Sequence, residues 1–163
     1  MEDKLCIALG DFDGVHLGHR RLLDVAVNNP YGFIPAVYTF NGNCKGARVI
    51  MTGEEKRARL SELGVRRIIF DDFENVRCLS PKEFAEKVLF ERLNAGAVVC
   101  GTDFRFGKDA AGDVGVLAAR KTEFVRYQAY DTKRSDGKGS GGARFTFFCN
   151  GHCRSWKTVG KPA

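Results

Sequence analysis

A glycine-rich segment between an apolar run and a helical pattern constrains the fold of this chain more than any other feature. Residues 5–9 are apolar and predict a buried strand, and residues 20–28 have the apolar spacing of a helix. Between them stands Gly-Asp-Phe-Asp-Gly-Val-His-Leu-Gly-His, residues 10–19. At a helix N-terminus, backbone N–H groups lack intrahelical partners and the helix dipole favours negative charge. We therefore expect residues 10–19 to bind a phosphate.

The same segment carries two of the three histidines of the chain, His16 and His19, in a His-x-Gly-His arrangement. Gly18 would let a ligand come close to the backbone between them. A single histidine is more often structural than functional, but two in one short turn favour a role at the phosphates of a nucleotide. A turn that only connects a strand to a helix stays open as the alternative.

Apolar runs alternate with helical patterns along the chain, which predicts an α/β fold with a Rossmann-like, doubly wound parallel sheet. Two intervening helices have capping boxes, Thr52-x-x-Glu55 and Ser80-Pro81-Lys82-Glu83. The first of these helices is predicted to end near Leu63. The second is predicted to end near Leu93 and to bury Phe84, Val88, Leu89 and Leu93 in the core. The expected strands are Leu5–Leu9, Phe33–Thr39, Arg67–Phe70, Ala97–Gly101 and Glu123–Tyr127.

Three segments follow expected strands directly, namely residues 10–19, 39–41 and 101–107. In a doubly wound sheet, ligands bind in the crevice beyond the carboxyl ends of the strands. We therefore expect these segments to converge on one site.

Composition and net charge limit the kinds of ligand and partner that we expect for this chain. The formal net charge of +6 suits anionic ligands without separating nucleotides from nucleic acid. Basic and aromatic residues do not interleave as in a nucleic-acid platform, so we expect no nucleic acid partner. No apolar run approaches the roughly 20 residues of a membrane span, and nothing resembles a signal peptide, so we expect a cytoplasmic protein without membrane contact. The six cysteines form no paired Cys-x-x-Cys knuckles, and no metal site is predicted.

Several motifs, in order over residues 5–131, resemble the FMN-adenylylating domain, or FAD synthetase domain, of the bacterial bifunctional riboflavin kinase/FAD synthetases. This family is a branch of the His-x-Gly-His nucleotidyltransferases. The Gly-Thr-Asp-Phe-Arg-Phe-Gly segment, residues 101–107, is what points to the flavin branch. The resemblance implies transfer of an adenylyl group from ATP to FMN, giving FAD and pyrophosphate, with Mg²⁺ accompanying the nucleotide. The other matching segments are 9–19, Tyr38-Thr39-Phe40, Glu55-Lys56, Leu63-Gly64-Val65 and 79–84.

The resemblance also implies the site residues. His16 and His19 would be catalytic, contacting ATP phosphates and stabilising charge at the transferred α-phosphoryl group. Core packing is the alternative for Phe104 and Phe106, and a solvated charge is the alternative for Arg105. The implied nucleotide-binding residues are Gly10, Phe12, Asp13, Gly14, Gly18, Asp103 and Arg105, and the implied flavin-binding residues are Thr39, Phe40, Phe104 and Phe106.

The C-terminal part departs from the family pattern. We assign residues 1–131 to the nucleotidyltransferase domain and residues 132–163 to a flexible, divergent tail without clear periodicity, and we expect no riboflavin kinase domain. Residues 139–146 replace a Ser-Ser-Thr-x-x-Arg element that supplies phosphate contacts in the family, so we expect impaired activity. Codons permitted for residues 150–160, read one nucleotide later, can encode a segment similar to the family helix, and a shifted reading frame would explain the departure.

Two alternatives to FAD synthesis stay open. One is another His-x-Gly-His adenylyl- or cytidylyltransferase with a different phosphate acceptor. The other is a non-catalytic nucleotide- or flavin-binding remnant. The sequence does not predict the oligomeric state.

Overall fold

A seven-stranded sheet forms the centre of the computed structural model, which describes residues 3–40, 49–118, 123–127, 145–149 and 152–156. The strand order is β3-β2-β1-β4-β5-β6-β7. The first five strands along the chain are parallel to one another, as the sequence predicted for a doubly wound fold. The strands are β1 (Leu5–Leu9), β2 (Ile34–Phe40), β3 (Arg67–Asp71), β4 (Ala95–Gly101), β5 (Glu123–Tyr127), β6 (Phe145–Cys149) and β7 (His152–Trp156).

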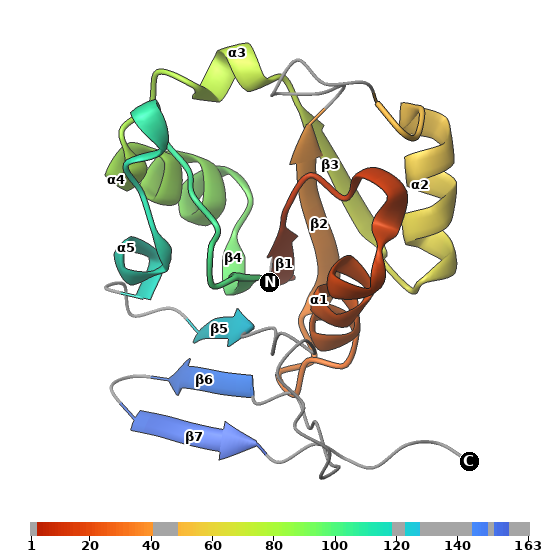
Figure 1. Cartoon of the computed structure of the whole chain (residues 1–163). Helices are drawn as coiled ribbons and strands as arrows, with labels where there is room; N and C mark the ends of the chain where they lie inside the picture. Colours follow the sequence, from red (N-terminus) through yellow and green to blue (C-terminus); the bar gives the residue numbers. More distant parts are fainter. Residues whose placement is uncertain (1–2, 41–48, 119–122, 128–144, 150–151, 157–163) are drawn as a thin grey trace, which may run out of the picture.

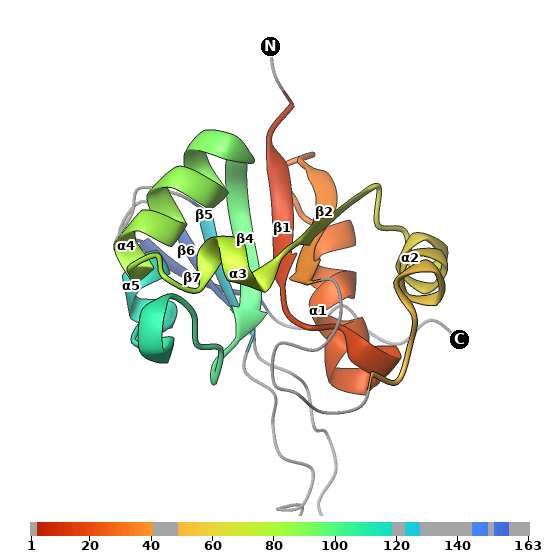
Figure 2. The same ribbon diagram turned by 90° about the horizontal axis from the view of Figure 1, so that it is seen from above.

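Helices cover both faces of the parallel strands, with α1 and α2 on one face and α4 and α5 on the other (Figure 2). The α-helices are α1 (Leu17–Val27), α2 (Gly53–Glu62), α3 (Phe73–Val76), α4 (Pro81–Glu83) and α5 (Val114–Ala118). A π-helix, η2 (Phe84–Arg92), continues α4, and two short 3₁₀ turns are η1 (Asp13–Val15) and η3 (Lys108–Ala110). Figure 1 shows β6 and β7 beyond β5, away from the helices α1 and α2.

Strand β1 is buried along its whole length because it lies between the two helical layers. Leu5, Ile7 and Leu9 pack into one core cluster with residues of η2 and α5. Cys6 and Ala8 point the other way, into a second cluster with α1 and α2. A strand covered on both faces reads as a continuous apolar run, which is why the sequence located it without error.

Both predicted capping boxes are present. The Thr52 hydroxyl accepts from the Glu55 N–H at 3.2 Å, and the Glu55 carboxylate accepts from the Thr52 N–H at 2.8 Å. Ser80 and Glu83 form the same reciprocal pair. The predicted core residues of the following helix are buried too, but residues 84–92 wind as a π-helix rather than an α-helix. The Leu93 N–H, for example, donates to the Val88 carbonyl, five residues back.

The prediction of irregular structure near the C-terminus is wrong for two segments. β6 pairs with β5, and β7 with β6, both antiparallel. The open edge of β5 offers unpaired backbone groups, and Phe-Thr-Phe-Phe-Cys in β6 is rich in residues that favour strands. The predicted flexibility of residues 132–144 falls outside the described residues.

We predict that Leu89→Ala lowers the free energy of unfolding by about 2–5 kcal/mol, because Leu89 is fully buried and its truncation leaves a cavity. Urea unfolding followed by circular dichroism measures the change. The matched control is Leu17→Ala, since Leu17 is 74% exposed and should change stability by less than about 0.5 kcal/mol. Equal effects of the two variants would contradict this account of the core.

Candidate active site

The candidate site lies where the order of the strands reverses. The chain runs from β1 outward to β2 and β3, and then returns to place β4 on the other side of β1. Residues 10–19 follow β1 and residues 101–107 follow β4, so both leave the carboxyl edge of the sheet at this switch point (Figure 2). Ligands of doubly wound sheets bind at this place. The strand arrangement thus places the ends of β1, β2 and β4 at the same edge of the sheet, and the convergence of the segments that follow them on one ligand stays a prediction.

The turn after β1 has an unusual backbone. Phe12, Gly14 and Val15 have φ angles of 54°, 71° and 39°, in or near the left-handed region. Left-handed conformations of side-chain-bearing residues cost on the order of 1–3 kcal/mol and persist only where the surroundings hold them. Phe12 and Val15 are buried, which provides that support. Gly10 makes room for the Phe12 ring, because a Cβ at Gly10 would lie 3.1 Å from a ring carbon.

The two histidines form a stacked pair at the start of α1. His16 is the N-cap residue, and its Nδ1 accepts from the His19 N–H at 3.4 Å. The ring centroids of His16 and His19 are 3.7 Å apart with an interplanar angle of 21°, and the Phe12 ring packs 4.9 Å from His19. Gly18 was expected to admit a ligand. Instead the His16 ring occupies this space, since a Cβ at Gly18 would lie 3.1 Å from its Cε1.

The surroundings of His19 favour its neutral form. Burial lowers the pKa of His19 from 6.5 to about 4, helped by the positive charges of His16 and Lys56 and opposed by Asp13. The Nδ1 atom of His19 is buried and has no hydrogen-bond partner among the described residues. Buried polar atoms of native proteins are usually paired, so the unpaired nitrogen makes His19 a candidate ligand contact.

Asp13 fastens the turn to the segment that leads into α2. Its carboxylate accepts from the Ile50 N–H at 2.9 Å and from the Met51 N–H at 3.0 Å. In this structure the Asp13 side chain is therefore occupied by backbone donors rather than directed to a nucleotide. The backbone around Gly14 stays the predicted phosphate contact.

The carbonyl of Asp11 is a junction of three segments. It accepts from the Thr39 hydroxyl at 2.7 Å and from the Lys56 ammonium at 2.9 Å. Thr39 was expected to face the flavin. It is fully buried, and its hydroxyl donates to the Asp11 carbonyl. The role of Lys56 was missed from the sequence. One signal was available, since Lys56 lies four residues before the core residue Leu60 and so shares its helix face.

Aromatic side chains gather on the other side of the sheet. Phe40 packs edge-on against Tyr38 at 5.6 Å, and Tyr38 packs against Phe84 at 5.6 Å. Phe106 lies 5.5 Å from Phe84 and 5.9 Å from Phe104. Phe106 is buried in the core, which agrees with the packing alternative, whereas Phe40 and Phe104 are only partly buried.

The remaining predicted nucleotide contacts lie after β4. Arg105 is 57% exposed and pairs with Asp113 at 3.4 Å. The Asp103 carboxylate folds back over Gly101, where an added Cβ would lie 2.8 Å from its Oδ1. Both side chains are therefore at the surface beside the switch point, and the guanidinium can exchange its exposed partner for a ligand phosphate.

A polar triad that joins β2, β3 and η2 was not predicted; Tyr38 and Asp71 are buried, whereas the Arg92 side chain is 49% exposed. The Tyr38 hydroxyl donates to the Asp71 carboxylate at 2.8 Å, and Arg92 forms an ion pair with the same carboxylate. Burial and the hydrogen bond to Asp71 raise the pKa of Tyr38, so the phenol stays protonated. The triad links η2 to strands β2 and β3, next to the aromatic side chains described above.

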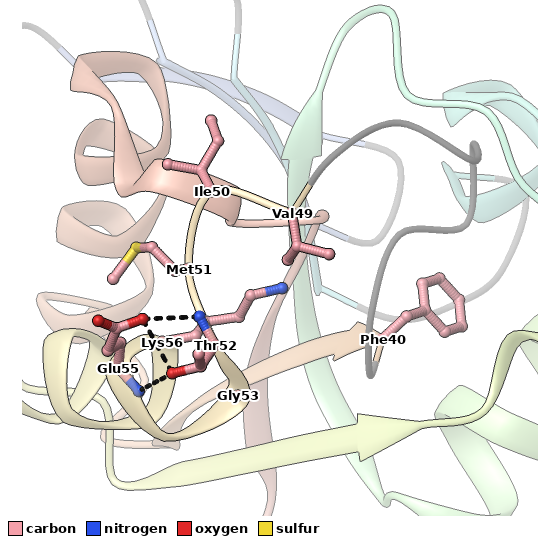
Figure 3. A pocket seen from close by; sticks show the side chains of 8 residues that line it. All are labelled: Phe40, Val49, Ile50, Met51, Thr52, Gly53, Glu55 and Lys56. Atoms are coloured by element: carbon pink, nitrogen blue, oxygen red, sulfur yellow. Dashed lines mark hydrogen bonds between the residues drawn. The ribbon is translucent and has the colours of Figure 1, made fainter.

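A cleft of about 290 Å³ opens beside the turn (Figure 3). Phe40 lies on one side of it, and the start of α2 with Lys56 lies on the other. Within the residues described, no three His, Cys, Asp or Glu side chains gather to hold a metal ion. None of the helices in the described part is long and apolar enough to cross a membrane. The cleft lining is Phe40, Val49, Ile50, Met51, Thr52, Gly53, Glu55 and Lys56.

A parallel sheet with helices on both faces and a histidine pair at the switch point define a Rossmann-like α/β domain of the nucleotidyltransferase type. The chain belongs to the FAD synthetase family, whose family model matches residues 1–139. This confirms the family expected from the sequence.

Curated relatives agree with this assignment. The bifunctional riboflavin kinase/FMN adenylyltransferase of Bacillus subtilis (strain 168) is 34% identical over 120 residues, covering 67% of this chain and 38% of the relative. FAD synthetase 1, chloroplastic, of Arabidopsis thaliana is 32% identical over 127 residues, covering 72% of this chain and 35% of the relative. The chain thus spans less than half the length of these two relatives.

A solved structure shows the same fold. A crystal structure described as a macrolide-efflux protein from Streptococcus pneumoniae superimposes with a TM-score of 0.71 at 26% identity. The match covers 82% of this chain and 49% of that one.

The low pKa of His19 predicts a pH-dependent stability. The unfolded chain binds a proton at His19 near pH 6.5, whereas the folded chain does so only near pH 4. Stability from this residue is therefore present above about pH 6.5 and is lost as the pH falls towards 4. We predict that His19→Gln loses less stability than the wild type between about pH 7 and about pH 4.5 in urea unfolding. Equal losses would contradict the burial of an uncharged imidazole.

Gly18→Ala should alter the histidine pair without lowering the free energy of unfolding. Alanine is favoured over glycine inside a helix by about 1 kcal/mol, so the free energy of unfolding should stay the same or rise. The added Cβ must nevertheless displace the His16 ring. We predict shifted imidazole resonances of His16 and His19 in NMR spectra and weaker ATP binding. Unchanged resonances would show that the stacking does not depend on the glycine.

Proposed function

We propose that this chain is an FMN adenylyltransferase that makes FAD and pyrophosphate from ATP and FMN. The observation that carries the proposal is the stacked His16–His19 pair at the switch point, with an unpaired buried Nδ1 on His19. Membership of the FAD synthetase family supports the choice of substrates. The requirement for Mg²⁺ and the cytoplasmic location stay predictions.

In the proposed reaction, a phosphate oxygen of FMN attacks the α-phosphorus of ATP. The new P–O bond forms while the bond from the α-phosphorus to the bridging oxygen of the β-phosphate breaks, and pyrophosphate leaves. Such a transfer needs alignment and charge stabilisation more than covalent chemistry by the protein. The imidazoles of His16 and His19 would hydrogen-bond to the phosphate oxygens, and the N-terminal end of α1 would add its dipole.

The burial of each predicted contact residue supports a different proposed role. Phe40 and Phe104 keep partly exposed rings on the aromatic side and are the proposed flavin contacts. Thr39 and Phe106 would act indirectly, since both are buried in the frame of the site. Arg105 would leave its exposed pair with Asp113 and contact phosphate, while Gly10, Phe12 and Gly14 shape the turn.

A non-catalytic nucleotide-binding role is the second candidate. It is favoured by the replacement of the Ser-Ser-Thr-x-x-Arg element by residues 139–146, which carry only Ser140 and Arg144 in its place. Loss of one preorganised donor costs about 100- to 1000-fold in rate. Nucleotide binding with very slow FAD formation would distinguish this candidate from an efficient enzyme.

We predict that ATP with MgCl₂ binds the wild-type chain in isothermal titration calorimetry and that FAD competes. His16→Ala and His19→Ala should each lower FAD formation, followed by chromatography, by about 100-fold or more, because a phosphate contact is lost. The control is Lys87→Ala, an exposed cation paired with Glu83 on the opposite helical layer. Absence of ATP binding by the wild type would refute the proposal. Pyrophosphate release with another acceptor, but no fluorescence quenching with FMN, would instead support a different nucleotidyltransferase.

A further inference from the structure

Lys56 is a buried lysine whose ammonium group binds a backbone carbonyl of the turn after β1. Its side chain is 2% exposed, and its ammonium donates to the Asp11 carbonyl at 2.9 Å and lies 3.7 Å from the Asp11 carboxylate. Removing an ammonium from water is costly unless it is paired and hydrogen-bonded. An apolar residue on this face of α2 would extend the core with Leu60, so the lysine is not explained by packing.

The bonded carbonyl is placed at the start of the strained turn. Asp11 precedes Phe12, whose φ angle is 54°. The Asp11 carbonyl accepts from Thr39 at the end of β2 and from Lys56 on α2, which occupies both of its lone pairs. Two donors from two elements therefore fix the orientation of the peptide that joins Asp11 to Phe12.

That peptide controls the histidine pair through Phe12. The Phe12 ring packs 4.9 Å from the His19 ring, which in turn stacks on His16. A rotation of the Asp11 peptide would move Phe12, and Phe12 could not move without disturbing His19. Asp13, two residues along, anchors the far side of the same turn to Ile50 and Met51.

We propose that Lys56 is a positioning residue for adenylyl transfer, which holds the Asp11 peptide and thereby the placement of Phe12 and the His16–His19 pair. That the reaction is adenylyl transfer depends on the proposed function. That Lys56 positions the histidines depends only on the contacts of the Asp11 carbonyl and the Phe12 ring.

Charge adds to the effect of geometry. Burial lowers the pKa of His19, and the charges of His16 and Lys56 lower it further. The charge of Asp13 raises it. Lys56 therefore helps to keep His19 uncharged before an anionic nucleotide arrives. Hydrogen bonding and charge can be tested separately, because Thr39 supplies the same carbonyl with a hydrogen bond but no charge.

The experiment measures the His19 pKa by NMR and ATP affinity by calorimetry in four variants. Lys56→Met removes the donor and the charge, and Lys56→Gln keeps a donor without charge. Thr39→Val removes the other donor while keeping Lys56. Arg57→Met is the matched control, since Arg57 is the next residue of α2, exposed, and stacked on Phe70 rather than on the turn.

In Lys56→Met and Lys56→Gln we expect the His19 pKa to rise above about 4, because a positive charge that lowers it is lost, while burial still holds it below 6.5. ATP binding by Lys56→Met should weaken about tenfold or more, as for the loss of a charged hydrogen bond. Thr39→Val should weaken ATP binding while leaving the His19 pKa low, and Arg57→Met should match the wild type in both measurements.

Wild-type His19 titration and ATP affinity in Lys56→Met would overturn the inference. Failure of both Lys56 variants to fold would also overturn it, because Lys56 would then serve stability rather than positioning. The readouts need neither FMN nor turnover. If the wild type makes no FAD but the His19 pKa rises in Lys56→Met, the proposed function fails and the role of Lys56 stands.

Discussion

The Asp11 carbonyl is the point on which the site depends. It receives one hydrogen bond from β2 and one from α2, and it opens the turn that leads from β1 to α1. A peptide held by two donors can support left-handed backbone at the following residue, which would otherwise relax. In the proposed positioning role, these two hydrogen bonds connect the turn that carries the histidines to elements distant in sequence.

The two faces of the sheet supply different chemistry to the carboxyl edge. The face covered by α1 and α2 carries charged and hydrogen-bonding groups, with Lys56 and Asp13 beside the histidine pair. The opposite face carries the aromatic series from Phe40 to Phe104, supported by the Tyr38–Asp71–Arg92 triad. FAD carries a diphosphate between two aromatic ring systems, so under the proposed function its phosphates would lie towards the histidine pair and its flavin towards the aromatic face.

The family resemblance and the structure complement each other. The family model ends at residue 139, and the described structure nevertheless continues the sheet through β6 and β7. Two antiparallel strands therefore cover the edge that β5 would otherwise leave open. The residues of β6 that favour extended backbone are consistent with this pairing.

The sequence by itself determined the layers, because buried parallel strands are continuous apolar runs and capping boxes act within four residues. It also predicted where the candidate site lies, since residues 10–19 carry both the turn and the histidines. Only the tertiary structure decided which protein atoms the predicted site residues contact. The Thr39 hydroxyl and the Asp13 carboxylate bond to backbone groups, and the His16 ring lies beside Gly18. Lys56 became visible for the same reason, since its partner is a backbone carbonyl 45 residues away that leaves no pattern in the sequence.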